Sequence, residues 1–198
     1  MSVDEEKLEL RRIAKEARSG WAGAAGDGAA ERLSENFLRA ETGFSPRPGV
    51  SGIIAGFWPM ADEIDVRALL TRLHGDGRTV ALPVVVGKAE PLIFRVWRPG
   101  LDLEGGGFGT RHPGPEQAEV SPRIVLTPLL AFDGQGHRLG WGGGFYDRTI
   151  AKLRSQSPVI TVGIAYQAQR VDSVPHGDLD EALDWMVTES GAQEIAKK

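Results

Sequence analysis

The sequence predicts a three-layer α/β fold, in which a mainly parallel sheet is flanked by helices on both faces. Short apolar segments recur along the chain without alternation, which is typical of strands buried on both faces. Helical patterns lie between several of them, and strands that alternate with helices usually form a parallel sheet. A length of 198 residues with 41% hydrophobic residues suits one sizeable core. We therefore expect a single domain over residues 1–198.

Two helices are expected at the start of the chain. Ser2 and Glu5 have the spacing of a capping box, which marks a helix N-terminus. The first helix is expected to end within residues 20–26, and a second is predicted over 28–40, with a stop at 42–48. The apolar residues at helical spacing in the first helix are Leu10, Ile13, Ala14, Ala17 and Trp21.

The continuous apolar segments place the strands, and two further helices fall between them. The strands are predicted over residues 51–58, 79–86, 92–97, 123–130 and 159–166. The helices are predicted over residues 64–74 and 145–155. Glycine concentrates at 100–114 and 134–144, and neither segment adjoins a linker-like change of composition. We interpret both as active loops or tight turns within the domain.

Composition and charge exclude several classes of function. A net charge of −4 provides no general field for nucleic acid or an anionic membrane, so a small-molecule partner is expected. The absence of cysteine excludes disulfides, thiolate metal sites and a cysteine nucleophile. Arg11 and Arg12 are adjacent, but no apolar run of an export signal follows them. We expect a cytoplasmic monomer or weak homodimer without a membrane partner.

The segment 126–148, LTPLLAFDGQGHRLGWGGGFYDR, carries the clearest chemical signal. Glycines at positions 140 and 142–144 let backbone N–H groups approach an anion, because no side chain obstructs them and positive φ is tolerated. A helix that starts near Phe145 would add its free N–H groups and its dipole. The segment matches neither a Walker A motif nor a complete G-x-G-x-x-G fingerprint.

Charged residues flank these glycines. Arg138 and Arg148 could bind phosphate oxygens, and Asp147 could hold the Mg²⁺ that accompanies a nucleoside triphosphate. The alternative is a glycine-rich connection whose arginines and aspartate pair on the surface. In the first helix, Lys7 and Arg11 lie beside the apolar face, where they could meet phosphates, whereas Lys15 is interpreted as part of a solvated face.

The string from Arg138 to Arg148, RLGWGGGFYDR, resembles the signature of the 5-formyltetrahydrofolate cyclo-ligase family. The similarity continues over most of the chain. Residues 7–11 resemble the family's Lys-x-x-Leu-Arg, and residues 57–65 resemble the segment whose glutamate contacts folate. Residues 169–189 follow the family's C-terminal pattern. The resemblance implies an ATP- and Mg²⁺-dependent enzyme that converts 5-formyltetrahydrofolate to 5,10-methenyltetrahydrofolate.

The resemblance also implies a set of site residues. Asp147 and Asp180 are the expected Mg²⁺ ligands, and Arg148 and Tyr146 are the expected catalytic residues. The expected nucleotide-binding residues are Lys7, Arg11, Arg138, Leu139, Gly140, Trp141, Gly142, Gly143, Gly144, Phe145 and Tyr146. The expected substrate-binding residues are Trp58, Glu63, Trp141 and Phe145.

Glu63 and Trp58 have other interpretations. Glu63 precedes a helix, where a carboxylate is favourable anyway, and the resemblance is what makes it a hydrogen-bond acceptor for the pterin. Trp58 could belong to the core, although contact with the substrate's apolar face is our choice. Two places depart from the family pattern: His112 stands where a glutamate is usual, and Gly177 and Leu179 replace the usual glutamate and histidine after Pro175. Both put the substrate side of the site in question.

The expected mechanism is a phosphoryl transfer, which needs positioning and charge neutralisation more than a strong base. The formyl oxygen of the substrate would attack the γ-phosphate, and N10 would then close the ring. A non-catalytic folate- or nucleotide-binding protein is the alternative that the two departures motivate. A sugar-phosphate isomerase or acyl-CoA-dependent transferase is a third, because such folds host many reactions, but Asp147 argues against it.

Overall fold

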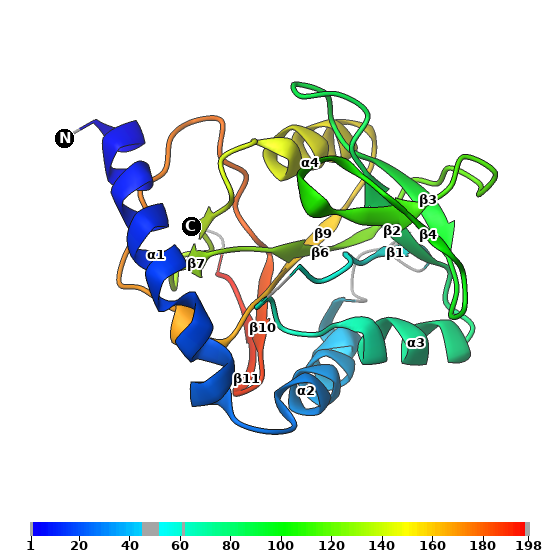
Figure 1. Ribbon diagram of the computed structural model, residues 1–198, viewed down its shortest axis with the longest axis horizontal. Helices are drawn as coiled ribbons and strands as arrows, with labels where there is room; N and C mark the ends of the chain where they lie inside the picture. The colour runs from blue at the N-terminus through cyan, green and yellow to red at the C-terminus, as the bar shows by residue number, and fades with distance from the viewer. Residues whose placement is uncertain (1, 45–51, 61, 197–198) are drawn as a thin grey trace.

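A computed structural model describes residues 2–44, 52–60 and 62–196. Within these residues, seven strands form the central sheet, in the order β11-β10-β9-β6-β1-β2-β3 (Figure 1). The inner strands β10, β9, β6, β1 and β2 run parallel, and β3 and β11 are antiparallel edges. The strands are β1 (Ile54–Ala55), β2 (Val80–Val84), β3 (Ile93–Trp97), β6 (Ile124–Pro128), β9 (Ile160–Ile164), β10 (Trp185–Thr188) and β11 (Gly191–Glu194).

Helices cover both faces of this sheet, as the sequence predicted. Helices α2 (Ala29–Phe44) and α3 (Arg67–Gly75) pack on one face, and α4 (Phe145–Gln156) packs on the other (Figure 1). Successive strand residues alternate between the two cores: Ile54 joins the α2–α3 side, whereas Ala55 joins the α4 side with Leu153. The predicted three-layer α/β fold is confirmed. The single domain over residues 1–198 stays a prediction.

Helix α1 (Val3–Ala25) lies across the end of the sheet rather than on a face (Figure 1). It contacts the short helix η2 (Gln167–Gln169), which follows the carboxyl end of β9. Its N-terminus is a capping box, as predicted: Glu5 N–H donates to Ser2 Oγ at 3.3 Å, and Ser2 N–H donates to Glu5 Oε2 at 2.8 Å. Helix α1 thus runs along the edge where parallel strands of α/β proteins present ligand sites.

The apolar face of α1 is narrower than predicted. Ala14 and Trp21 are buried and Leu10 is partly buried, but Ile13 is 48% exposed and Ala17 is also exposed. The predicted helix is confirmed, but Ile13 and Ala17 lie outside its buried stripe. The reason is the placement of α1, because a helix at the end of a sheet contacts it through a stripe and not through a wide face.

The predicted strand over 51–58 shrinks to β1, and Ser51 lies outside the described residues. Gly56 N–H still donates to Ala81 O at 2.9 Å, but the chain then leaves the sheet. Pro59 lacks the N–H group that a longer ladder would need. The early exit brings the following residues, including Glu63, to the carboxyl end of the sheet.

Several elements were not predicted as such. Strands β10 and β11 extend the sheet, and two small hairpins stand outside it. The hairpins are β4 (Leu103–Gly105) with β5 (Arg111–Pro113), and β7 (Ala131–Phe132) with β8 (Arg138–Leu139). Between β4 and β5 lies the short helix η1 (Gly107–Gly109). Both glycine concentrations thus belong to hairpins or their continuations. Among the described residues, no helix is both long and apolar enough to span a bilayer.

We expect Gly163→Ala to destabilise the fold. A Cβ at Gly163, in β9, would lie 2.6 Å from Leu183 Cδ1 and closer still to Met186 Sδ. Overpacking of this kind lowers the free energy of unfolding by about 1–3 kcal/mol. Gly191→Ala is the control, because nothing lies within 4 Å of its added Cβ, and its effect should stay within about 0.5 kcal/mol. Urea denaturation of both variants measures the difference, and equal stabilities would contradict the packing argument.

Candidate active site

The loop between β8 and α4, residues 140–144, is the centre of the site and is called the glycine loop below. Helix α1 lies against it: Arg11 Nε donates to Gly140 O at 3.0 Å. A Cβ at Gly142 would lie 3.4 Å from Arg11 Cζ, so the guanidinium lies next to the loop backbone. The structure therefore brings together two predicted nucleotide-binding segments that are 129 residues apart in sequence.

The backbone of the glycine loop has the conformation that the glycines were predicted to allow. Gly142 and Gly144 have φ of 102° and 62°, values that residues with side chains rarely adopt. Helix α4 starts at Phe145, and Gly144 at its N-cap provides no side-chain cap. The first N–H groups of α4 are therefore oriented towards the loop without a capping side chain, as in anion sites at helix N-termini.

Lys7 reaches across from α1 to the segment after β9. Its Nζ lies 2.5 Å from Asp180 Oδ2, and the Gly177 N–H donates to the same oxygen at 2.7 Å. Burial raises the pKa of the Asp180 carboxyl. The hydrogen bonds from Lys7 and the Gly177 N–H together lower this pKa by more than burial raises it, so the net shift is downward. Asp180 is therefore held as a carboxylate beside a cation. The sequence singled out both residues without predicting that they pair.

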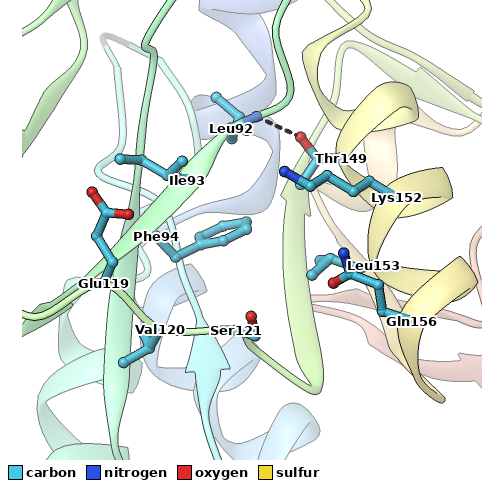
Figure 2. A pocket seen from close by; sticks show the side chains of 10 residues that line it. All are labelled: Leu92, Ile93, Phe94, Glu119, Val120, Ser121, Thr149, Lys152, Leu153 and Gln156. Atoms are coloured by element: carbon cyan, nitrogen blue, oxygen red, sulfur yellow. Dashed lines mark hydrogen bonds between the residues drawn. The ribbon is translucent and has the colours of Figure 1, made fainter.

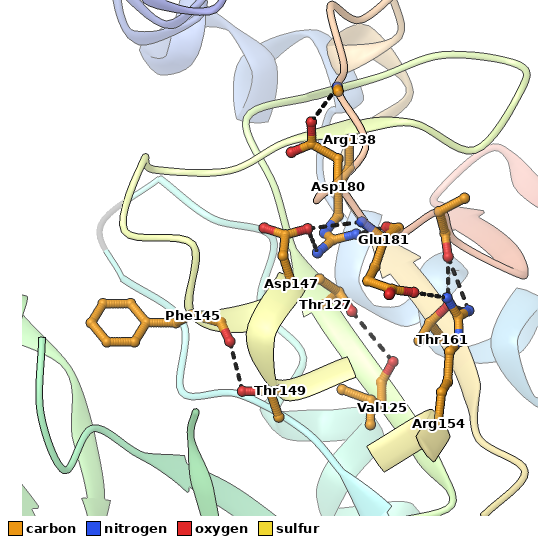
Figure 3. Close-up of polar contacts among 12 residues, drawn as sticks. Val125, Thr127, Arg138, Phe145, Asp147, Thr149, Arg154, Thr161, Asp180 and Glu181 are labelled. Atoms are coloured by element: carbon orange, nitrogen blue, oxygen red, sulfur yellow. Dashed lines mark hydrogen bonds and ion pairs between the residues drawn. The ribbon is translucent and has the colours of Figure 1, made fainter. Parts of the chain in front are cut away.

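Arg138 and Asp147 form the second ion pair of the site, with Nη2–Oδ1 at 2.6 Å (Figure 3). The Arg138 side chain is only 4% exposed. Both partners also bind the backbone of Glu181. Arg138 Nη1 donates to the Glu181 carbonyl, and the Glu181 N–H donates to Asp147 Oδ1 at 3.2 Å. Burial lowers the pKa of Arg138, while Asp147 and Asp180 raise it, and the net shift is downward. An arginine nevertheless keeps its charge in proteins.

Arg148 lies on the other side of the glycine loop. Its Nη2 donates to Gly143 O at 2.7 Å and to Lys88 O at 3.3 Å, and its Cζ lies 5.4 Å from the ring centroid of Phe145. Its buried Nε has no hydrogen-bond partner in the described part of the structure. The guanidinium is thus bound to backbone carbonyls in this conformation. Binding of a phosphate by Arg148 would require it to exchange those partners.

Two of the predicted substrate-binding residues meet at the loop. Trp141 Nε1 lies 3.3 Å from Glu63 Oε1, and Glu63 Oε2 accepts from Met60 N–H at 2.9 Å. Burial and the charge of Glu63 raise the pKa of Tyr146, so its hydroxyl is a hydrogen-bond donor rather than a base at neutral pH. Lys15 is exposed, as expected for a solvated face, with Nζ 5.6 Å from the Trp141 ring centroid.

Trp58 is partly buried, and its recorded contacts are with the protein's own core and surface. Its ring lies edge to face with Trp97, with centroids 6.3 Å apart, and Arg67 Cζ lies 5.6 Å from its centroid. Packing against Trp97 and Arg67 is therefore enough to explain the position of the Trp58 ring. Its role as a substrate contact stays a prediction.

A turn after β7 fixes the strand that carries Arg138. Asp133 is 1% exposed, and its carboxylate accepts from the N–H groups of Gln135, His137 and Val174 at 2.8–3.1 Å. His137 Nδ1 also lies 3.2 Å from Asp133 Oδ2, and the ring of His137 stacks on His176 at 3.5 Å between centroids. His137, whose side chain is 18% exposed, is therefore a structural residue of this turn.

A polar cluster behind Asp180 was not found by sequence reasoning. Arg154, on α4, donates to Glu181 Oε2 at 2.5 Å and to Thr161 Oγ1 at 3.1 Å (Figure 3). It also donates to Asp184 Oδ2 at 2.9 Å. Asp184 also accepts from the Thr161 N–H at 2.9 Å. The cluster joins α4 to β9 and to the segment that carries Asp180. Nothing local signals it, because the partners of Arg154 are 7 to 30 residues away in sequence.

A cavity of about 310 Å³ lies between β3 and α4, apart from the glycine loop (Figure 2). Apolar side chains from both elements, among them Phe94 and Leu153, form its floor, and Lys152 and Glu119 stand at its rim. The Thr149 hydroxyl is already used there, as an acceptor from Leu92 N–H at 2.8 Å. None of the predicted site residues lines this cavity.

The chain was compared with known families and structures. A model described as the 5-formyltetrahydrofolate cyclo-ligase family matches residues 5–189. The chain belongs to this family. The 5-formyltetrahydrofolate cyclo-ligase of Haemophilus influenzae is 38% identical over 135 residues, covering 66% of this chain and 72% of that protein. The cyclo-ligase of Escherichia coli is 34% identical over 142 residues, covering 69% and 78%.

Solved structures agree with this assignment. The 5,10-methenyltetrahydrofolate synthetase of Aquifex aeolicus superposes with a TM-score of 0.75 at 26% identity, covering 97% of this chain and 94% of that one. The family, the fold and the prediction that the chain is an enzyme are confirmed. The isomerase and transferase alternatives are set aside. The assignment of individual site residues stays a prediction for this cyclo-ligase family member.

The two departures from the family pattern lie in different surroundings. His112 is on β5, where its Nδ1 lies 3.1 Å from Pro113 O and its ring lies under Gly106. Gly177 donates its N–H to Asp180, so a backbone group serves the predicted metal ligand at that position.

We expect Asp133→Asn to weaken the fold at neutral pH. Burial raises the pKa of Asp133. The hydrogen bonds from three N–H groups and from His137 together lower this pKa by more than burial raises it, so the net shift is downward. The stability from this carboxylate is thus present above the unfolded pKa of about 4 and is lost as the pH falls through the folded value. Asparagine keeps one acceptor oxygen but replaces the other with an NH₂ donor and removes the charge, which should lower the free energy of unfolding by about 1–3 kcal/mol at pH 7.

The measurement is urea denaturation between pH 7 and pH 2. The wild type should lose its advantage over Asp133→Asn at the acid end. The exposed Asp102→Asn is the control, with no change expected at either pH. A difference that stays constant over this range would show that the charge of Asp133 contributes nothing.

Arg154→Met should destabilise the protein through the cluster behind Asp180. Removal of the guanidinium takes the Arg154 cation away from Asp184, which is 5% exposed. Because Arg154 itself is 27% exposed, we expect a loss of about 2–3 kcal/mol, below the range for fully buried pairs. The exposed Arg39→Met, which breaks a surface pair with Glu35, should leave the urea midpoint unchanged. Similar midpoints for both variants would contradict this.

Proposed function

We propose that this chain closes 5-formyltetrahydrofolate to 5,10-methenyltetrahydrofolate, with conversion of ATP to ADP and phosphate. The observation that carries the proposal is the position of α1, whose Arg11 contacts the glycine loop and whose Lys7 pairs with Asp180 after β9. In a chain with a net charge of −4, these cations, Arg138, Arg148 and the uncapped N-terminus of α4 form a local site for a triphosphate.

The proposed chemistry has two steps. The formyl oxygen attacks the γ-phosphorus, the bond to the β-phosphate oxygen breaks, and ADP leaves. N10 then attacks the activated formyl carbon, loses its proton, and phosphate departs with the former formyl oxygen as the ring closes. Neither step needs a strong base or a nucleophilic side chain from the protein, because positioning and charge stabilisation dominate phosphoryl transfer.

Asp147 and Asp180 are the residues that would hold Mg²⁺. Among the described residues, no group of three or more histidine or acidic side chains could hold a metal by itself. Two carboxylates completed by phosphate oxygens are, however, a usual arrangement for Mg²⁺. The link of both aspartates to the Arg138–Glu181 unit supports this assignment. Bound Mg²⁺ would neutralise negative charge on the phosphates. The protein would hold the ion in position through the two carboxylates.

The substrate side is proposed to lie around Glu63, Trp141 and Tyr146. The Glu63 carboxylate is an acceptor for pterin N–H donors, and it now accepts from Trp141. Tyr146, kept protonated by burial and by the charge of Glu63, can donate to the formyl or phosphate oxygen. Phe145, at the first turn of α4, forms an apolar wall beside them.

The test mixes purified protein with 5-formyltetrahydrofolate and Mg²⁺, with and without ATP, and follows the near-ultraviolet absorbance of the methenyl product. Absorbance that grows only with ATP supports the proposal. Folded protein that binds ATP without forming this chromophore would refute it and favour the binding-protein alternative.

Asp147→Asn is expected to lower kcat by about 100-fold or more, above the usual effect of residues that only support a metal ligand. The expected cause is loss of Mg²⁺ at the phosphates, so activity should recover in part at high magnesium concentration. Asp172→Asn changes an exposed aspartate and should leave kcat and the magnesium requirement unchanged. Full activity of Asp147→Asn at ordinary magnesium levels would rule out the metal role.

A further inference from the structure

Phe108 is an unusual residue for a loop in water. Its side chain is 69% exposed, although an apolar ring of this size is normally buried. Its backbone has φ 63° and ψ 21°, and among the described residues it is the one non-glycine residue with positive φ. This left-handed conformation is unfavourable for a bulky side chain, and such strain persists where the surroundings impose it, most often at functional sites.

The surroundings do impose it. Phe108 is at the tip of the β4–β5 hairpin, in a turn closed by Gly106 N–H to Thr110 O at 2.8 Å. Thr110 Oγ1 also donates to Gly107 O at 2.8 Å. A Cβ at Gly106 would lie 2.8 Å from His112 Cδ2, so the turn rests closely on that ring. Any of the neighbouring glycines would adopt positive φ more easily than phenylalanine does.

The ring of Phe108 points to the active site. It lies edge to face with Phe145, with centroids 5.7 Å apart and an interplanar angle of 63°. Phe145 immediately follows the glycine loop and packs with the core on the β2–β3 side of the molecule. Helix α1, with Lys7 and Arg11, approaches the loop from the opposite side (Figure 1). The two phenylalanines therefore lie away from Lys7 and Arg11, whereas Arg148, which is also proposed for the phosphates, lies against the Phe145 ring.

We infer that Phe108 is a specificity-determining residue, whose ring packs with Phe145 on the planar aromatic part of the folate substrate. This inference rests on the proposed function. An exposed aromatic ring gains from covering a flat apolar surface, and the Phe145 ring supplies the second wall of the same site. The fixed turn holds the Phe108 ring in place before the substrate arrives.

The test uses two variants of Phe108. Phe108→Gly removes the ring and suits positive φ, so the melting temperature should stay equal or rise; Phe108→Ala removes the ring but keeps the strain. Both should raise the KM and the Kd for 5-formyltetrahydrofolate by about 10-fold, the size expected for a lost apolar contact. The KM for ATP should change less than about 2-fold, and Phe108→Tyr should restore folate binding. Ile13→Ala, another exposed apolar side chain, is the control and should change none of these.

The Kd is measured by calorimetry with 5-formyltetrahydrofolate alone, so that it does not depend on turnover. If the wild type binds folate without forming the methenyl product, the proposed reaction fails but the Kd of the variants still decides the role of Phe108. Unchanged folate Kd and KM in a folded Phe108→Gly would overturn the inference, as would an equal rise in the KM for ATP. No folate binding by the wild type would overturn both.

Discussion

The ion pair between the buried Arg138 and the partly buried Asp147 is the interaction on which the rest of the site depends. A guanidinium that is 4% exposed cannot remain without a counter-charge, and a carboxylate beside it cannot move without leaving that charge unpaired. Because both partners also bind the backbone of Glu181, the pair fixes three segments together: strand β8, the start of α4 and the segment after β9. The glycine loop connects β8 to the start of α4, so this pair fixes both of its ends.

The fold could be predicted from the sequence where burial leaves a simple pattern. Continuous apolar segments marked the inner strands β1, β2, β6 and β9 but not β10, and the capping box at Ser2 marked the first turn of α1. Edge strand β11 was missed because three of its four residues are exposed, so it has no apolar run. Strand β1 was predicted too long because Phe57 is buried like a strand residue, although the chain has already left the sheet at Gly56.

The site shows the same division. Local chemistry identified the glycine loop, its arginines and Asp147, because glycine density and nearby charge are visible in a short segment. The pairings between side chains could not be predicted from the sequence, because Lys7 and Asp180 are 173 residues apart and Trp141 and Glu63 are 78 residues apart. Only the folded sheet brings these partners to one edge. Phe108 was overlooked for another reason: its strained backbone and exposed ring are properties of the turn and not of the residue type.

The contact between Lys7 and Asp180 also has a consequence for synthesis. Lys7 belongs to α1 and Asp180 lies 173 residues further along the chain, so the pair cannot form before residue 180 has been synthesised. Contacts between residues so far apart in sequence are slow to form, because closing a long loop is entropically unfavourable. Until residue 180 has emerged, α1 exposes a basic stripe without its acidic partner. A nascent chain would therefore lack the complete site proposed for the phosphates until its fold has closed.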